Sequence, residues 1–129
     1  MKVLVTGASG FVAKHVVSYL SKHGHETVTT DMAGTENVGS VTDKSFVFET
    51  LAKLDFESVV HLAAIADLKR TIDNPYVAFD VNSYGTLNML ELALRKGVKR
   101  FVYASSSNVY GAPKKNPVTE ETDFDPRVP

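Results

Sequence analysis

A small-residue turn directly after the first apolar run is the feature that most constrains this chain. Residues 5–16 read VTGASGFVAKHV, in which Gly7, Gly10 and Ala13 stand three apart. A strand that turns straight into a helix points the free N–H groups and the positive dipole end of that helix at one spot, where a phosphate is favoured. Gly7 would permit the tight turn, Gly10 would let the backbone approach a pyrophosphate, and Ala13 would let the helix pack on the sheet. A glycine-rich turn without any ligand is the alternative.

Runs rich in β-branched residues alternate with helical patterns along the whole chain. Strands are predicted at 2–6, 25–31, within 36–43, at 58–64 and at 99–106. Helices are predicted at 10–23, 44–53 and 75–96. After Gly111 the sequence predicts a loop that reaches residue 129 without another element.

This alternation predicts the class of fold. Strands separated by helices indicate right-handed crossovers and a parallel sheet, and therefore an α/β protein. With 129 residues, of which 43% are hydrophobic, the chain forms one domain with enough apolar material for a core.

Composition excludes several classes of partner. A net charge of −1 with both signs interspersed gives no electrostatic footprint for nucleic acid or for an acidic membrane. The sequence shows neither a signal peptide nor an apolar run of membrane-spanning length. The absence of cysteine rules out disulfides and thiolate metal sites and favours a cytoplasmic location. The four histidines are too scattered for a metal site, and His61, in an apolar strand, is predicted to be a core histidine.

Asp31 strengthens the case for a dinucleotide site. It ends the second predicted strand about 20 residues after the glycine turn, where a carboxylate can accept hydrogen bonds from an adenosine ribose. Such an acid would repel a 2′-phosphate and so favour NAD over NADP. A solvent-facing loop acid is the alternative reading of Asp31.

Six segments then stand in the order and spacing of a known family, namely TGASGFVAKHV (6–16), Asp31, GSVTD (39–43), HLAA (61–64), NPYVAFDVNSYGT (74–86) and YASSSNVYG (103–111). The chain resembles the extended short-chain dehydrogenases/reductases, and within them the nucleotide-sugar epimerases and dehydratases of the UDP-galactose (UDP-glucose) 4-epimerase kind. The resemblance implies a Rossmann-like, doubly wound parallel sheet of about five strands in the order 3-2-1-4-5. It also implies NAD across the carboxyl ends of the strands, with a nucleotide-sugar substrate beyond it.

The resemblance assigns cofactor contacts to residues at the strand ends, namely Gly7, Gly10, Phe11, Val12, Asp31, Ser40, Val41, Leu62, Ala63, Ala64 and Asn82. Ser40 stands where the family usually has an aspartate that meets the adenine amino group, so a weaker hydroxyl contact is expected there. Asn82 matches a family asparagine near the cofactor and strand 58–64. A polar helix residue that bonds neighbouring backbone is the alternative for Asn82.

Ser106 is the residue that the resemblance places in the chemistry. Alignment on Val109-Tyr110-Gly111 makes it the counterpart of a catalytic serine or threonine that hydrogen-bonds the reacting sugar oxygen. A strand-end serine that only satisfies loop backbone is the alternative, and spacing alone does not choose among Ser105, Ser106 and Ser107.

The catalytic tyrosine and the lysine four residues after it follow, in the family, a phrase much like DFDPRVP (123–129), where this sequence stops. Tyr110 belongs to the strand-end motif and does not replace that tyrosine. Residues 1–129 are therefore expected to be the N-terminal NAD-binding part of a longer enzyme, inactive alone and a homo-oligomer through helix 75–96 or the edge of strand 99–106. A non-catalytic dinucleotide-binding module and an NAD-dependent sensor are the alternatives.

Overall fold

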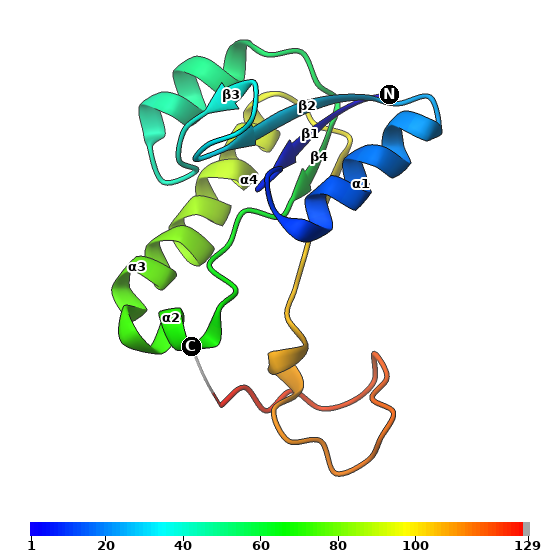
Figure 1. Cartoon of the computed structure of the whole chain (residues 1–129), viewed down its shortest axis with the longest axis vertical. Helices are drawn as coiled ribbons and strands as arrows, with labels where there is room; N and C mark the ends of the chain where they lie inside the picture. Colours follow the sequence, from blue (N-terminus) through cyan, green and yellow to red (C-terminus); the bar gives the residue numbers. More distant parts are fainter. Residues whose placement is uncertain (128–129) are drawn as a thin grey trace.

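The strands of the chain form one parallel sheet in the computed structural model, which describes residues 1–127. They are β1 (Lys2–Thr6), β2 (Glu26–Asp31), β3 (Asn37–Val38), β4 (Ser58–His61) and β5 (Arg100–Tyr103). Their spatial order is β3-β2-β1-β4-β5 (Figure 1). This confirms the predicted α/β fold, its Rossmann-like sheet and the order of the five strands.

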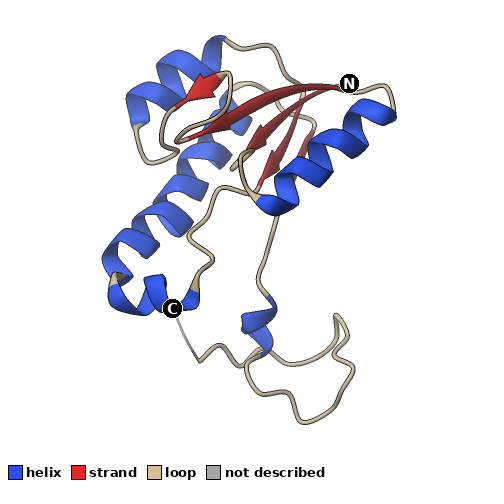
Figure 2. Cartoon of the chain, in the orientation of Figure 1, coloured by secondary structure: helices blue, strands red, loops and turns tan. Residues whose placement is uncertain are grey.

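Helices cover both faces of the sheet (Figure 2). One face carries α1 (Phe11–Lys22), which packs on β1 and β2. The other carries α4 (Thr86–Arg95) together with the helical turns η1 (Phe46–Thr50) and η2 (Leu51–Lys53). α3 (Pro75–Phe79) and η3 (Asp80–Gly85) continue into α4 as a rod that projects beyond the carboxyl ends of the strands, and α2 (Leu68–Asp73) lies beside the far end of this rod (Figure 1).

The two hydrophobic clusters lie on opposite sides of β1. Successive side chains of a strand point to opposite faces, so Val3 and Val5 pack with Ala13 beneath α1, while Leu4 packs with Met89 beneath α4. All three β1 side chains are at most 2% exposed. β1 is thus buried on both faces, as expected for a central parallel strand, and it holds the turn that follows it in a fixed place.

Two predicted strands end earlier than the sequence indicated. β4 ends at His61 instead of residue 64, and β5 ends at Tyr103 instead of residue 106. The reason at β4 is a side chain that competes with the sheet, because Thr6 Oγ1 accepts the N–H groups of Leu62 and Ala63, each at 3.2 Å. Residues 62–64 therefore leave the sheet and line a cavity.

The helices follow the predictions with two differences. Residues 46–53 have π-type and 3-10 turns in place of a regular helix, although Asp43 caps them as expected by accepting the N–H groups of Ser45 and Phe46. Segment 75–96 is helical from Pro75 to Arg95, but its middle, η3, has π-type turns. Such wide turns occur within α-helices and are frequent at functional sites.

α2 was not predicted from the sequence. At six residues it is too short to show an apolar period, and only its cap could have revealed it. Asp67 Oδ1 accepts the N–H of Arg70 at 2.7 Å, which is the hydrogen bond of an ordinary N-cap.

The chain beyond β5 extends away from the sheet (Figure 1). One 3-10 turn, η4 (Ser107–Tyr110), is followed by loop to residue 127, as predicted for the part after Gly111. The loop folds back on η4, since Asp125 donates its N–H to Val109 O at 2.9 Å and the rings of Tyr110 and Phe124 lie 5.7 Å apart. The predicted loop at 128–129 lies outside the described residues. In the described part of the chain, no helix is both long enough and apolar enough to cross a bilayer.

Candidate functional site

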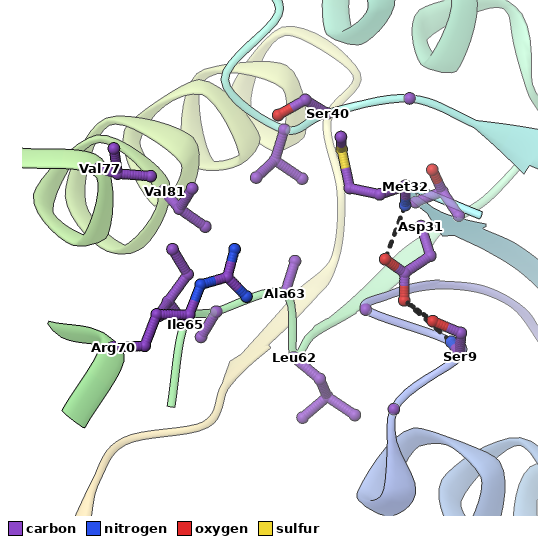
Figure 3. Close-up of a pocket in the computed structure, with 16 residues that line it drawn as sticks. Ser9, Asp31, Met32, Ser40, Leu62, Ala63, Ile65, Arg70, Val77 and Val81 are labelled. Carbon is purple, nitrogen blue, oxygen red and sulfur yellow. Dashed lines mark hydrogen bonds between the residues drawn. The ribbon is translucent and has the colours of Figure 1, made fainter. Parts of the chain in front are cut away.

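A cavity of about 560 Å³ lies at the carboxyl ends of β1, β2 and β4 (Figure 3). The β1 turn and the end of β2 contribute Gly7, Ser9, Gly10, Thr30, Asp31 and Met32. The loops after β3 and β4 contribute Gly39, Ser40, Val41, Leu62, Ala63 and Ala64. Ile65, Arg70, Val77 and Val81 line the end that faces α2 and the helical rod.

Gly7 fixes the turn at the base of the cavity. Its φ of +66° lies in the left-handed region, and a Cβ at this position would stand 2.7 Å from the backbone of Leu62 and Ala63. Both the conformation and the close approach of the β4 loop therefore require glycine. Gly10 has an ordinary φ of −69° and donates its N–H to Gly7 O at 3.0 Å. Its lack of a side chain matters for space at the cavity.

The N-terminus of α1 faces the cavity without a cap. Gly10 is the N-cap residue, and among residues 1–127 no side chain accepts a hydrogen bond from the first turn, which also contains no acid. The first N–H groups of a helix have no partner within the helix. The side chains of Phe11 and Val12 are 80% and 58% exposed and do not line the cavity, so their predicted roles depend on backbone N–H groups.

Asp31 is held in position by three donors. The backbone N–H and the hydroxyl of Ser9 both reach Oδ2, the former at 3.0 Å, and the N–H of Met32 reaches Oδ1 at 2.6 Å. The half-buried carboxylate therefore stands fixed on the wall of the cavity beside the glycine turn (Figure 3). Ser9 was missed by the sequence reasoning, although its place inside the turn could have drawn attention to it.

Thr30 adds a buried polar atom to this wall. The residue is 1% exposed, and among the described residues its Oγ1 has no hydrogen-bond partner. A buried hydroxyl without a partner costs about 1–3 kcal/mol.

The loop after β4 is held by a chain of hydrogen bonds in which each donor can be assigned. Thr6 Oγ1 accepts two backbone N–H groups, so its own proton donates to His61 Nδ1 at 2.7 Å. His61 Nε2 then donates to Thr86 Oγ1 at 3.1 Å, and the Thr86 hydroxyl donates to Asn82 O at 2.7 Å. This pattern requires a neutral imidazole.

His61 is 1% exposed, which confirms the predicted core histidine. Burial disfavours the charged ring and lowers the pKa of His61 to about 4. The neutral form that the hydrogen bonds require is therefore the stable one at neutral pH.

Asn82 lies near β4 as predicted, but its side chain does not line the cavity. Its Oδ1 accepts the N–H of Ile65 at 2.8 Å and its Nδ2 donates to Ile65 O at 3.1 Å. Asn82 thus holds the backbone of the loop after β4, 17 residues away in the sequence.

Ser40 and Val41 do line the cavity. The hydroxyl of Ser40 is engaged within its own loop, where it accepts the N–H of Thr42 at 3.1 Å and lies 2.7 Å from Thr42 Oγ1. Val41 O accepts a hydrogen bond from Asn88 Nδ2 at 2.9 Å, which ties this loop to α4. Val41 is buried, so it offers an apolar surface held in a fixed place.

Ser106 lies outside the cavity lining. It is exposed, and its Oγ accepts the N–H of Asn108 at 3.2 Å to begin η4. The structural role that the sequence left open for this serine is therefore present. Tyr110 and Lys114 stand four residues apart just beyond it, but they too lie outside the cavity and in a segment without a helix of the α type.

Several further residues at the cavity were not foreseen, among them Val77, Val81 and Arg70. Val77 and Val81 lie one helical turn apart on the predicted helix 75–96, and that spacing could have pointed to them. Arg70 gave no signal because α2 itself was missed. Within residues 1–127, no three side chains of His, Asp and Glu come together as a metal site would need.

The fold and this geometry together define a class of protein. A parallel sheet in the order 3-2-1-4-5, a glycine turn into an uncapped helix and an acid at the end of β2 are the features of a Rossmann-like dinucleotide-binding domain. The family model described as "NAD dependent epimerase/dehydratase family" matches residues 3–129. The chain belongs to this family.

Individual relatives agree with that assignment. UDP-glucose 4-epimerase 2 of Oryza sativa subsp. japonica is 32% identical over 98% of this chain and 36% of its own length. The UDP-glucose 4-epimerase of Lactobacillus helveticus is 31% identical over the whole chain and 42% of its own length. The chain thus spans about two fifths of the curated relatives it matches.

Solved structures show the same architecture. The UDP-glucose 4-epimerase from Bifidobacterium longum, in complex with NAD+ and UDP, gives a TM-score of 0.89 at 29% identity, over 97% of this chain and 43% of that one. The UDP-glucose 4-epimerase from Thermus thermophilus, in complex with NAD, gives a TM-score of 0.88 at 31% identity, over 99% of this chain and 45% of that one.

Proposed function

We propose that this chain is the NAD-binding portion of a nucleotide-sugar epimerase/dehydratase of the UDP-glucose 4-epimerase kind. The observation that carries the proposal is the convergence of the glycine turn, the uncapped start of α1 and the fixed Asp31 carboxylate on one cavity. The relatives named above are UDP-glucose 4-epimerases, and the two similar structures named above both contain NAD.

The residues present fit NAD. The α1 N-terminus offers N–H groups to the pyrophosphate, and Asp31 offers its carboxylate to the adenosine ribose. The apolar surface of Val41, Val77 and Val81 suits a flat base. Leu62, Ala63 and Ala64 would follow the cofactor across the end of β4, where the two alanines leave room for a ribose.

In such an enzyme NAD supplies the acceptor for a transient hydride from C4 of the sugar. Ser106 would hydrogen-bond the sugar oxygen, and a tyrosine with a lysine four residues later would take its proton. Tyr110 and Lys114 have that spacing but lie away from the cavity, so we expect residues 1–129 alone to give no turnover.

The second candidate is a binding module or sensor that holds the dinucleotide without turning it over. It is favoured by the position of Ser106, whose oxygen is engaged by the Asn108 N–H outside the cavity. The two candidates predict the same NAD binding. They differ in one outcome, since only the first candidate predicts that a chain as long as the relatives epimerises UDP-sugars.

Calorimetry tests NAD binding, which both candidates predict. Gly10→Val should abolish binding, because a branched side chain would enter the pyrophosphate path. The fold should survive because φ at Gly10 is ordinary. The one close contact, Gly7 O at 3.0 Å from a Cβ, requires that carbonyl to move by a few tenths of an ångström. Ser18→Val, which adds the same kind of branched side chain at an exposed position of α1, is the control. Unchanged NAD affinity in a folded Gly10→Val protein would contradict the proposal.

The same titrations should show that NAD binds better than NADP. Asp31→Ala should weaken NAD binding by about 10- to 100-fold, the range for loss of hydrogen bonds to a charged group. It should also reduce the preference for NAD over NADP. Equal binding of NAD and NADP by the wild-type chain would show that Asp31 does not meet the ribose.

We also expect the chain to self-associate. Large apolar side chains are exposed along the rod, among them Tyr76, Phe79, Leu87 and Leu94, and Val102 and Tyr103 are exposed on β5. A groove lined by Tyr76, Phe79 and Tyr84 lies on the same rod. Sedimentation at high concentration measures this directly, and a clean monomer would contradict it.

A further inference from the structure

The cavity carries one charged side chain that the dinucleotide assignment does not use. Arg70 is the only lysine or arginine among its lining residues, and its guanidinium points into the cavity between Ile65 and Ala63 (Figure 3). Asp31, the only acid of the lining, lies at the opposite end. Among residues 1–127, no carboxylate lies close enough to pair with Arg70.

The backbone beneath Arg70 is fixed although its side chain is exposed. Asp67 Oδ1 accepts the Arg70 N–H at 2.7 Å. The next residue, Thr71, is 4% exposed, and its hydroxyl donates to Leu68 O at 2.8 Å. α2 also packs against α3, so the backbone of Arg70 is held in place beside the cavity.

The surroundings decide what Arg70 can meet. The donors for phosphate lie at the other end, where α1 begins, and the end near Arg70 is formed by Ile65, Val77 and Val81. The hydroxyl of Ser40 is already engaged by Thr42, so the edge of a base finds little there. A flat base in an apolar slot offers its face, and a guanidinium stacks on such a face.

We propose that Arg70 stacks on the adenine of the bound dinucleotide and closes that end of the cavity. This rests on the proposed NAD-binding function and adds a recognition residue to it. Pairing of Arg70 with a phosphate is the competing role, and the experiment separates the two.

The experiment compares three variants by calorimetry with ADP-ribose, which carries the adenine without the nicotinamide. Arg70→Ala should weaken binding by about 5- to 30-fold, within the range for stacking of a planar side chain on a base. Arg70→Trp keeps a planar face without charge and should restore binding. Arg70→Lys keeps the charge but lacks a planar group, and it should not restore binding. Lys69→Ala, the same loss of charge on the outer side of α2, should leave binding within about twofold.

A second readout comes from fluorescence. The chain contains no tryptophan, so Arg70→Trp introduces its sole one. ADP-ribose should quench that emission through contact with the base. Rescue by Arg70→Lys and not by Arg70→Trp, or unchanged affinity in Arg70→Ala, would overturn the stacking role while leaving the cavity assignment intact. Failure of the wild-type chain to bind NAD or ADP-ribose would instead overturn the proposed function itself.

Discussion

The cavity beside β1 and the turn that follows β5 are built in opposite ways. Around the cavity, Gly7, Asp31 and His61 are each held by backbone approach or by hydrogen bonds between elements far apart in the sequence. After β5, Ser106 makes its only side-chain hydrogen bond within the described residues two positions along the chain, and residues 102–108 are all exposed. The binding side of the molecule is thus fixed by tertiary structure, whereas the side assigned to chemistry is fixed only locally.

This difference separates cofactor binding from turnover, two properties that the family resemblance implies together. A site whose donors are already oriented loses little entropy when it binds its ligand. A hydroxyl on an exposed local turn has no such orientation, and catalysis depends strongly on the placement of reacting groups. We therefore expect cofactor binding to be a property of residues 1–127 and turnover to need further contacts around Ser106.

The largest effect is expected where the turn touches the β4 loop. Gly7→Ala should destabilise the chain by roughly 2–5 kcal/mol. The new side chain would have to adopt a left-handed φ, and its Cβ would stand 2.7 Å from the backbone of Leu62 and Ala63. Gly24→Ala is the matched control, since φ is +75° but nothing lies within 4 Å of its Cβ. It should cost only about 1–2 kcal/mol.

Urea unfolding of both glycine variants measures this. Equal losses would show that conformation alone matters at Gly7, and that the β4 loop is not held against the turn.

A smaller effect concerns pH. Burial lowers the folded-state pKa of His61 to about 4 from its ordinary value of 6.5. The unfolded chain therefore binds a proton more readily, so the stability due to neutral His61 is complete above pH 6.5 and is lost as the pH falls toward 4. A difference of this size corresponds to about 3 kcal/mol.

His61→Gln should remove this part of the pH dependence, whereas His15→Gln, at an exposed position of α1, should retain it. Unfolding free energies at about pH 7.5 and about pH 5, on either side of the ordinary histidine pKa, provide the comparison. If the unfolding free energy changed equally between the two pH values in the wild-type chain and in His61→Gln, His61 would not be a buried neutral group in solution.

What the sequence could predict follows the same division. The glycine turn, Asp31 and the parallel α/β sheet were accessible because they depend on local residue types and on alternation that tertiary packing reinforces, whereas the strand order came from the family resemblance. The early end of β4 was not, since it depends on Thr6 reaching Leu62 and Ala63 across 56 and 57 residues. Arg70 was not accessible either, because a helix of six residues leaves no periodic trace.

The smallest effect is expected at the turn after β5. Ser106→Ala should change the affinity for NAD by less than about twofold, as for a surface substitution, because Ser106 lies outside the cavity lining. Ser105→Ala and Ser107→Ala should behave in the same way, and calorimetry on the three variants under identical conditions measures the effect. A roughly tenfold loss confined to Ser106→Ala, about 1.4 kcal/mol, would mean that this turn closes over the cofactor in solution. The binding site would then extend to β5, and the separation between an oriented cavity and a local turn would not hold.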